Sequence, residues 1–456
     1  MQNRKLILSF LMCFSILISI PTVFCMTPAP VVYVAGDGSG DFNCSGTNDQ
    51  IQINQALQFV AENPNYTTVY LKGPFTYTVN DTLLIGNNTT LEGDPTAVIK
   101  LADNAGWTQE KSFITQMGSH GQNITIKGFK IDGNREKNTV ISGDGFYNFI
   151  NLTNCQNIDI HHMYLTNNHG DGLKTKSCSN LKFHDNEAYL LGHDVLYAAN
   201  CLDIEAYNNR ITCRTNSGLR IYNSNSVTFY NNDITSRGSG GAGIEIQKHG
   251  TSVMDDIEVY NNTIHETKLV GIWIFGSGYY PPSSTNVSVH HNQIYNTGTN
   301  SSNNKIGGIV SDGFNVLVEN NVIDGVYGTG IAQKNVYNNN ESYSALNGSG
   351  YIVTARNNII TNTRSSSDGM NATGVSNFLT GTHSFVLENN CFDNNSGGDY
   401  WNVDPSTTDI QAYPLYADGS SHDYHLKSKS GRWSGSAWVS DSVNSPCIDA
   451  GHPLSD

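Results

Sequence analysis

Short apolar runs with strict alternation recur along the middle of the chain. In SNLKFHDN, at 179–186, two apolar residues stand two positions apart and a polar turn follows. Such runs are too short for helices, and a period of two is typical of half-buried strands. The apolar pairs repeat every 23 to 37 residues, at Ile158/Ile160, Leu181/Phe183, Ile204/Ala206, Val227/Phe229, Ile257/Val259, Val287/Val289, Val316/Val318, Val353/Ala355 and Phe385/Leu387.

Asparagine follows the same period, at Asn186, Asn209, Asn232, Asn262, Asn292, Asn321, Asn358 and Asn390. One such unit cannot bury its apolar face alone, whereas stacked units can, with parallel strands about 4.8 Å apart. Asparagine suits a stack because its amide can bond to the Asn above and below, and because it tolerates left-handed backbone in tight turns. The pattern therefore predicts an all-β fold, a right-handed single-stranded parallel β-helix.

Different patterns flank these units. Residues 1–25 combine a basic start with an apolar run, which predicts a secretory signal peptide. Residues 48–63 carry apolar side chains at near-helical spacing, which predicts an amphipathic helix that caps the N-terminal end of the solenoid. We expect the β-helix to span residues 26–400, and residues 401–456 to close over its last coil as part of the same domain.

Three cysteines form a further row with a period of 23 residues. Cys155, Cys178 and Cys201 are followed by Ser224 at the same spacing. Stacked thiols point the same way and cannot all pair, so we predict small buried side chains here rather than disulfides or a metal site. The seven cysteines after the predicted signal peptide form no obvious disulfide framework.

Composition and charge limit the partners. The 456 residues include 44 Gly, only 14% charged residues and a net charge of −15, which argues against nucleic acid as a partner. No second apolar stretch is long enough to span a membrane. We therefore expect a secreted or cell-surface protein, without stable membrane insertion once the signal peptide is removed, and a monomer.

One strand aligns across seven units, as in DGLKTK, SGLRIY and VGIWIF. Its first aliphatic residue is expected to point into the core, and a shift by one residue would exchange the two faces. This inward row is Leu173, Leu196, Leu219, Ile244, Ile272, Ile309 and Ile331. The outward rows are then Lys174, Tyr197, Arg220, Glu245, Trp273, Val310 and Ala332, and Lys176, Ala199, Tyr222, Gln247, Phe275, Asp312 and Lys334.

The outward rows combine aromatic rings, cations and carboxylates in one strip. Aromatic faces stack on sugar rings, and Arg or Lys pairs with uronate carboxylates. We therefore predict substrate-binding roles for Lys174, Lys176, Tyr197, Arg220, Tyr222, Gln247 and Trp273, with His193 beside them. The alternative is packing, because loops near 236–242 and 276–286 could cover the aromatic rings.

Carboxylates stand at the entrance to this strip. Asp171 and Asp194 are one coil apart, and Glu245 lies two coils beyond Asp194. Adjacent coils are about 5 Å apart and alternate coils about 9.5 Å, which suits a retaining or an inverting pair of catalytic carboxyls. We predict catalytic roles for these three residues, with His169 and His193 as proton carriers and no metal. The alternative is structural, since a turn aspartate often binds backbone N–H groups.

The entry DG…TVYL…TTLEG, the coil pattern and the exit SPCIDAGHP resemble the secreted right-handed β-helix family of carbohydrate-active enzymes, a pectate-lyase-like solenoid. Within it, the chain most resembles the disaggregatases and disaggregatase-related surface proteins of methane-producing archaea. That resemblance implies depolymerisation of methanochondroitin, a matrix polysaccharide of glucuronic acid and N-acetylgalactosamine.

The flanks NNHGDG and GHDV also distantly resemble the NTDG and DD elements of polygalacturonases, whose aspartates act as general acid and base. The departures are that His193 replaces one aspartate, Ser217 stands near the histidine of that family, and Glu245 and Gln247 replace a basic pair. The polygalacturonase mechanism therefore cannot be copied onto this chain.

Three functions follow from these patterns. The first is an endo-acting glycoside hydrolase on an acidic or amino-sugar polysaccharide, without a cofactor. The second is a polysaccharide lyase, in which Lys174, Lys176 or Arg220 takes a proton and the predicted catalytic carboxylates hold Ca²⁺. The third is a non-catalytic β-helix that binds glycan or builds an envelope. Carboxylates inside an aromatic strip favour an enzyme.

Overall fold

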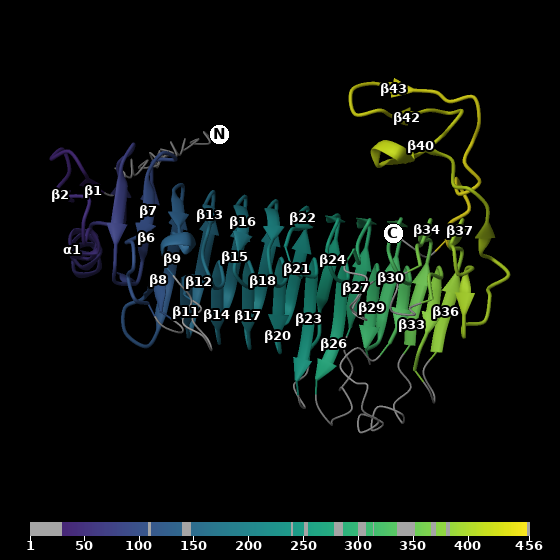
Figure 1. Cartoon of the computed structure of the whole chain (residues 1–456), viewed down its shortest axis with the longest axis horizontal. Helices are drawn as coiled ribbons and strands as arrows, with labels where there is room; N and C mark the ends of the chain where they lie inside the picture. The colour runs from purple at the N-terminus through teal and green to yellow at the C-terminus, as the bar shows by residue number, and fades with distance from the viewer. Residues whose placement is uncertain are drawn as a thin grey trace, which may run out of the picture.

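Three long parallel sheets wind into one solenoid, as the repeat predicts (Figure 1). The computed structural model describes residues 30–107, 111–138, 147–238, 240–249, 254–277, 286–299, 307–312, 314–334, 352–365, 371–379 and 384–453. The predicted signal peptide lies outside these residues. None of the helices within them is long and apolar enough to cross a membrane.

Among the described residues, sheet A has 14 strands, which contain the apolar pairs of the repeat. In spatial order they are β2 (Phe42–Asn43), β1 (Val31–Ala35), β3 (Thr68–Leu71), β6 (Thr89–Gly93), β9 (Gly121–Lys127), β12 (Cys155–His161), β15 (Ser179–His184), β18 (Leu202–Tyr207), β21 (Asn225–Tyr230), β24 (Ile257–Tyr260), β27 (Val287–His290), β30 (Val316–Glu319), β33 (Ile352–Arg356) and β36 (Ser384–Glu388).

Sheet B follows sheet A in each coil and has 13 strands in the described part of the chain. They are β4 (Thr76–Val79), β7 (Val98–Leu101), β10 (Lys130–Asp132), β13 (Tyr164–Thr166), β16 (Glu187–Leu191), β19 (Arg210–Cys213), β22 (Asp233–Ser236), β25 (Thr263–His265), β28 (Gln293–Tyr295), β31 (Val322–Asp324), β34 (Ile359–Thr361), β37 (Cys391–Asp393) and β39 (Ile410–Gln411).

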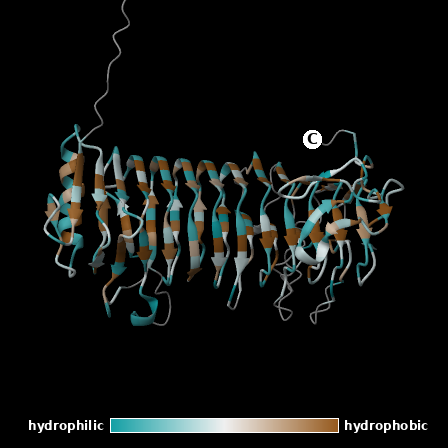
Figure 2. Ribbon diagram, turned by 90° about the horizontal axis from the view of Figure 1, so that it is seen from above, coloured by the Kyte–Doolittle hydropathy of each residue, from teal (hydrophilic) through white to brown (hydrophobic). Residues whose placement is uncertain are grey.

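Sheet C completes the coil and carries the strip predicted to bind substrate. Its 12 described strands are β5 (Leu83–Ile85), β8 (Ser112–Gln116), β11 (Asn148–Thr153), β14 (Leu173–Lys176), β17 (Leu196–Ala199), β20 (Leu219–Tyr222), β23 (Ile244–His249), β26 (Ile272–Ser277), β29 (Ile309–Asp312), β32 (Ile331–Gln333), β35 (Val375–Asn377) and β38 (Tyr400–Trp401). Apolar and polar residues alternate along the strands (Figure 2), so each strand contributes one face to the common core.

The predicted asparagine row is present between sheets A and B as a buried ladder. From Asn209 onward, each side chain accepts hydrogen bonds, through Oδ1, from the backbone N–H and the Nδ2 of the preceding Asn, as Asn262 does from Asn232 at 3.0 and 2.9 Å. At the start of the row, Asn186 Oδ1 accepts the backbone N–H of Met163 at 3.0 Å. Sequence reasoning placed the left-handed backbone on these same residues. It lies instead one residue earlier, at Asp185, Asn208, Asn231, Asn261, His291, Asn320, Asn357 and Asn389. We call the eight buried residues, Asn186 to Asn390, the asparagine ladder.

The row of thiols is also buried in the core, with free cysteines as predicted. The sulfur of Cys178 accepts the backbone N–H of Cys155, and that of Cys201 accepts the N–H of Cys178, both at 3.4 Å. In the same way, the hydroxyl of Ser224 accepts the backbone N–H of Cys201 at 3.0 Å. Small side chains are needed here because each one sits under the backbone of the previous coil.

The expected helix forms as α1 (Gln50–Glu62), at the N-terminal end of the solenoid (Figure 1). Its buried residues Ile53, Ala56, Leu57 and Val60 are continuous with the main core. Two short 3₁₀ helices are also described, η1 (Arg135–Lys137) and η3 (Gly419–Ser421).

The segment after β39 leaves the solenoid and forms two antiparallel hairpins, β40 (Tyr416–Asp418) with β41 (Asp423–Leu426) and β42 (Arg432–Trp433) with β43 (Trp438–Val439). We expected this part to lie over the last coil. Its described contacts reach the last coils, where Asn389 Nδ2 donates to the carbonyl of Ala450 at 2.9 Å. They also reach sheet B along the side of the solenoid, where His422 stacks on Tyr295 and the Tyr424 hydroxyl donates to Asp324 at 3.0 Å.

Candidate active site

The strands of sheet C pair in the register that the aliphatic row predicts. Leu173, Leu196 and Leu219 are direct neighbours and continue in order to Ile331. The outward row therefore places Lys174 beside Tyr197, and Arg220 beside Glu245. Residues far apart in the sequence are thus brought together on four adjacent strands, β14, β17, β20 and β23.

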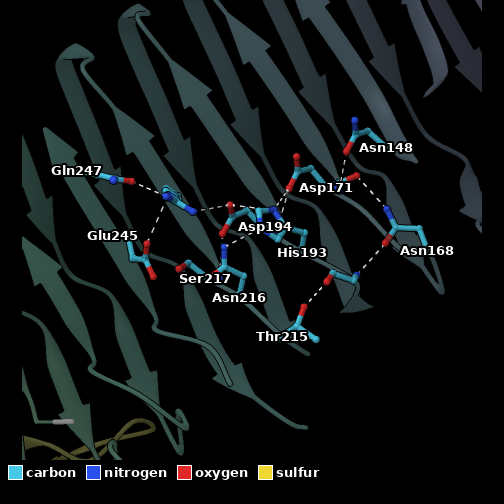
Figure 3. Close-up of polar contacts among 12 residues, drawn as sticks. Asn148, Asn168, Asp171, His193, Asp194, Thr215, Asn216, Ser217, Glu245 and Gln247 are labelled. Atoms are coloured by element: carbon cyan, nitrogen blue, oxygen red, sulfur yellow. Dashed lines mark hydrogen bonds and ion pairs between the residues drawn. The ribbon is translucent and has the colours of Figure 1, made fainter. Parts of the chain in front are cut away.

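A row of acidic and polar side chains lies at the entrance to these strands (Figure 3). Asn148 Oδ1 accepts the backbone N–H of Asp171 at 2.8 Å, and Asp171 Oδ1 accepts that of Asp194 at 3.0 Å. Asp194 Oδ1 in turn accepts the N–H of Ser217 at 3.0 Å. We call Asn148, Asp171, Asp194 and Ser217 the aspartate row. Asp171 and Asp194 therefore have the structural role of turn aspartates, which is to accept backbone N–H groups. In Asp194 this role occupies only one of the two carboxylate oxygens.

His193 joins the two carboxylates. Its Nδ1 lies 2.7 Å from Asp171 Oδ1 and 3.3 Å from Asp194 Oδ2, and its Nε2 lies 3.2 Å from Asn216 Nδ2. The side chain of His193 is 35% exposed, whereas those of Asp171 and Asp194 are 6% and 0% exposed. His193 is therefore the member of this group that a ligand on the surface of sheet C would meet.

Arg220 lies on the other side of Asp194. Its Nη1 is 3.4 Å from Asp194 Oδ2, its Nε is 3.4 Å from Glu245 Oε2, and its Nη2 donates to Gln247 Oε1. The guanidinium also lies over the ring of Tyr197, 5.3 Å from its centroid. Two carboxylates, an amide and a ring thus fix the orientation of one cation, which is 17% exposed.

Burial and neighbouring charges shift two proton equilibria. Complete burial raises the pKa of Asp194 to about 7, with a further increase from Asp171 and Glu245, while His193 and Arg220 oppose the shift. Burial opposes protonation of His193, but its hydrogen bond to Asp171 and the charges of both aspartates raise its pKa overall. A carboxyl with a pKa of about 7 and an imidazole with a raised pKa therefore lie in direct contact.

Asp171, His193 and Asp194 also form the group of described residues that could hold a metal ion, since one ligand atom from each lies within 4.8 Å of the others. Ca²⁺ prefers six to eight oxygen ligands. Here one donor is an imidazole, one oxygen of each carboxylate already accepts a backbone N–H, and Arg220 adjoins Asp194. The group does not suit Ca²⁺, and we derive no step through a metal.

Trp273 is not the surface platform that the sequence predicts. It is 2% exposed and stacks on Phe275, with ring centroids 3.9 Å apart, in a cluster with Val270, Val310 and Ala332. The packing alternative therefore holds for these two rings, although residues 278–285 lie outside the described residues. When these outward-facing rings pack against each other, they remove apolar surface from contact with water, which is favourable.

The other predicted site residues, the catalytic Glu245 and the remaining substrate-binding residues, divide into two groups. Glu245 and Gln247 are buried around Arg220, at 4% and 6% exposure. Lys174, Tyr197 and Tyr222 are partly exposed and Lys176 is exposed, so the accessible strip covers β14, β17 and β20. His169 lies apart, with its Nε2 2.8 Å from the carbonyl oxygen of Asn138, and burial lowers its pKa.

Sequence reasoning missed three asparagines that support His193 and its neighbours. Asn148 begins the aspartate row, Asn168 donates to the carbonyl of Asp171 at 2.9 Å, and Asn216 contacts the ring of His193. Asn148 stands one period of 23 residues before Asp171, so stepping back one coil would have found it. A hollow of about 600 Å³ lies elsewhere, on sheet A beside Glu258 and Leu317, and holds none of this chemistry.

Comparisons with known proteins agree with this architecture. Residues 254–451 match the family described as Disaggregatase related, and residues 87–277 match the right handed beta helix region. None of the curated proteins matches the sequence.

Solved structures share the fold at low sequence identity. The A-module of a mannuronan C-5 epimerase from Azotobacter vinelandii is 18% identical, with a TM-score of 0.59 over 82% of this chain and 98% of that one. A family 28 exopolygalacturonase from Yersinia enterocolitica is 14% identical, with a TM-score of 0.53 over 84% and 79%. The surface adhesin PfbA of Streptococcus pneumoniae is 13% identical, with a TM-score of 0.52 over 81% and 91%. The chain is therefore a right-handed parallel β-helix similar to polysaccharide-active proteins, and its predicted resemblance to the disaggregatase-related family is confirmed.

Proposed function

We propose that this protein is an extracellular polysaccharide depolymerase, an endo-acting glycoside hydrolase on an acidic, amino-sugar-containing polymer of the methanochondroitin type. The observation that carries the proposal is the contact of Asp171, His193 and Asp194, in which one carboxyl has a pKa of about 7. Glycoside hydrolysis needs such a pair of carboxyls, one protonated and one ionised, near the scissile bond.

The roles follow from exposure. Asp194 holds a proton near neutral pH but is fully buried, so it does not itself reach a sugar in this arrangement. His193 is partly exposed and contacts both carboxylates through Nδ1, so its ring can pass a proton between them and the substrate. Asp171 orients the ring. This assignment keeps the predicted catalytic roles of Asp171 and Asp194 and uses His193 as the predicted proton carrier.

Substrate would lie along the accessible strip of sheet C. Lys176 is exposed and Lys174 partly so, which places two cations where uronate carboxylates could pair with them. Tyr197 and Tyr222 offer partly exposed rings on the two following strands. A strip on the side of a solenoid does not enclose the end of a polymer, which favours cleavage within the chain.

Polysaccharide lyase activity is a second candidate because of the same exposure pattern. A β-elimination needs a base beside the proton alpha to the uronate carboxyl and an acid for the leaving oxygen. His193 is a partly exposed base, and burial raises the pKa of Tyr197, so the Tyr197 hydroxyl stays protonated. Arg220 or Lys174 would neutralise the uronate carboxylate.

One experiment separates these functions. The purified chain is incubated with polymers of glucuronic acid and N-acetylgalactosamine, and the products are analysed by mass spectrometry and ultraviolet absorption. Hydrolysis adds water to each cleaved bond, whereas elimination yields an unsaturated, absorbing uronate. Binding without any cleavage would contradict both enzymatic proposals and support a glycan-binding protein.

Variants locate the activity. His193→Gln should lower the rate by about 10²-fold or more, because the proton carrier is lost. The matched control is His265→Gln, which removes another partly exposed histidine that pairs with a carboxylate, Asp233, at 3.0 Å on sheet B. Equal loss in both variants would show that the site is not where we place it.

A further inference from the structure

Two cysteines meet where the C-terminal segment docks on the solenoid. Cys391 begins β37 of sheet B and is buried, and Cys447 lies in SPCIDAGHP and is partly exposed. Their thiols hydrogen-bond to each other. Both also line a cavity of about 300 Å³ between the segment and the last coils.

The surrounding contacts hold the two backbones in place. Asn389 Nδ2 donates to the carbonyl of Ala450 at 2.9 Å, and the backbone N–H of His452 donates to Asn357 Oδ1 at 2.7 Å. The backbone N–H of Cys447 donates to Ser445 Oγ at 3.1 Å. The segment is therefore attached to the solenoid close to Cys447, on its C-terminal side.

The core cysteines provide a contrast within the same chain. Cys155 and Cys178 are also neighbours, but the sulfur of Cys178 accepts a backbone N–H, and both residues are only 2–3% exposed. A disulfide there would remove that acceptor and would need an oxidant to enter the core. Although Cys391 is itself only 2% exposed and its Sγ donates to the carbonyl of Ala412 at 3.2 Å, Cys447 is partly exposed, so an oxidant can reach its sulfur. Its hydrogen bond to Cys391 lowers the pKa of Cys447, which favours the thiolate that attacks a disulfide.

We propose that Cys391 and Cys447 form a disulfide bond that fastens the C-terminal segment to sheet B. The oxidant is a disulfide of low molecular weight or of an oxidoreductase. The Cys447 thiolate attacks it and releases one thiol, and Cys391 then loses its proton and displaces the second thiol. Two S–H bonds and one S–S bond are replaced by the new S–S bond and two thiols, so two electrons pass from the protein to the oxidant.

The test uses the full chain, equilibrated with oxidised glutathione, alkylated under denaturing conditions and digested with trypsin without reduction. Lys427, Lys429 and Arg432 separate the two cysteines, so trypsin gives different peptides for them. The expected result is one linked species that contains Cys391 and Cys447, with Cys155, Cys178 and Cys201 alkylated. Alkylation of both Cys391 and Cys447, or linkage of either to another cysteine, overturns the proposal.

A second readout tests whether the C-terminal segment is covalently attached to the solenoid. Limited trypsin treatment of the oxidised native protein should leave the C-terminal peptide attached, whereas Cys447→Ser should release it after cleavage near Lys429. Cys178→Ser is the matched control and should retain the peptide. Retention in Cys447→Ser equal to that in the oxidised parent, measured under denaturing conditions without reduction, also overturns the proposal.

Discussion

Two rows of side chains run from coil to coil, and they do the same structural work with different chemistry. In the asparagine ladder, each amide accepts from the previous coil and donates to the next, as Asn262 does toward Asn292 at 3.0 Å. In the aspartate row, Asp171 and Asp194 likewise accept backbone N–H groups from a neighbouring coil. A carboxylate has no N–H to donate, however, and its second oxygen carries charge.

The difference shows where chemistry can arise in a repetitive fold. The amides of the ladder carry no charge and satisfy their hydrogen bonds within the solenoid, so they require no charged partner. The aspartate row requires cationic partners. His193 and Arg220 take this role, on opposite sides of Asp194. Replacement of amides by acids in a structural row therefore marks the candidate site.

The largest expected effect comes from turning the aspartate row into amides. Asp194→Asn should lower the depolymerisation rate by about 10²–10⁴-fold, because a titrating group is lost. The fold should persist, since an amide oxygen can still accept the N–H of Ser217. Product release from the polymer measures the rate, and circular dichroism checks the fold.

Asp233→Asn is the matched control, because Asp233 pairs with His265 away from sheet C. It should leave the rate unchanged. If Asp194→Asn and Glu245→Gln both keep the parent rate while Lys174→Ala or Arg220→Ala abolishes it, the carboxylates do not perform the proton transfer. The lyase mechanism would then replace the hydrolase.

The reverse exchange tests the ladder. Asn262→Asp places a carboxylate at 1% exposure, facing the carbonyl of Phe229 and Asn292 Oδ1, which both accept hydrogen bonds from the native amide. An uncompensated buried charge should lower the free energy of unfolding by about 3–5 kcal/mol at neutral pH. Denaturant unfolding measures this. The control is Asn261→Asp at an exposed position. If Asn262→Asp lowered the free energy of unfolding by less than this control does, the view that the ladder excludes charge would be contradicted.

The pH dependence of stability sharpens the comparison further. Burial raises the pKa of Asp194 from its ordinary value of 3.8 to about 7, so the folded state keeps this proton after the unfolded chain has lost it. Stability from this group is complete below pH 4 and is lost as the pH rises through about 7. Asp194→Asn lacks this loss and should exceed the parent in stability at pH 8 by more than about 1 kcal/mol, with little difference at pH 4.

The pH experiment has an internal check. The stability from the His193 and Asp171 hydrogen bond decreases as the pH rises through the raised pKa of His193, and Asp171 is intact in both proteins. That contribution therefore largely cancels between them. A stability difference that stays constant from pH 4 to pH 8 would mean that Asp194 does not hold its proton in the folded state.

Periodicity made the fold and the register predictable from the sequence, because stacked coils repeat the same environment. Periodicity alone was enough to predict that the row from Leu173 to Ile331 and the thiol row face the core. Exposure was not predictable, because it depends on what covers a strand. Trp273 and Tyr197 have equivalent positions, yet Trp273 is buried and Tyr197 is not. Likewise, spacing placed Asp171 beside Asp194 but did not show that His193 lies between them and the surface.

The smallest effect is expected in the thiol row, which is a third form of the same coil-to-coil design. Cys178→Ser should lower the free energy of unfolding by less than about 1.5 kcal/mol, because a hydroxyl can accept the N–H of Cys155 as Ser224 accepts that of Cys201. Polymer cleavage should be unchanged, since this row faces the core and not the strip on sheet C. Denaturant unfolding and product release on the same preparation measure both quantities. Loss of activity in a folded Cys178→Ser protein would show that the row is more than packing, and that side chains with neither charge nor exposure can also contribute chemistry in this solenoid.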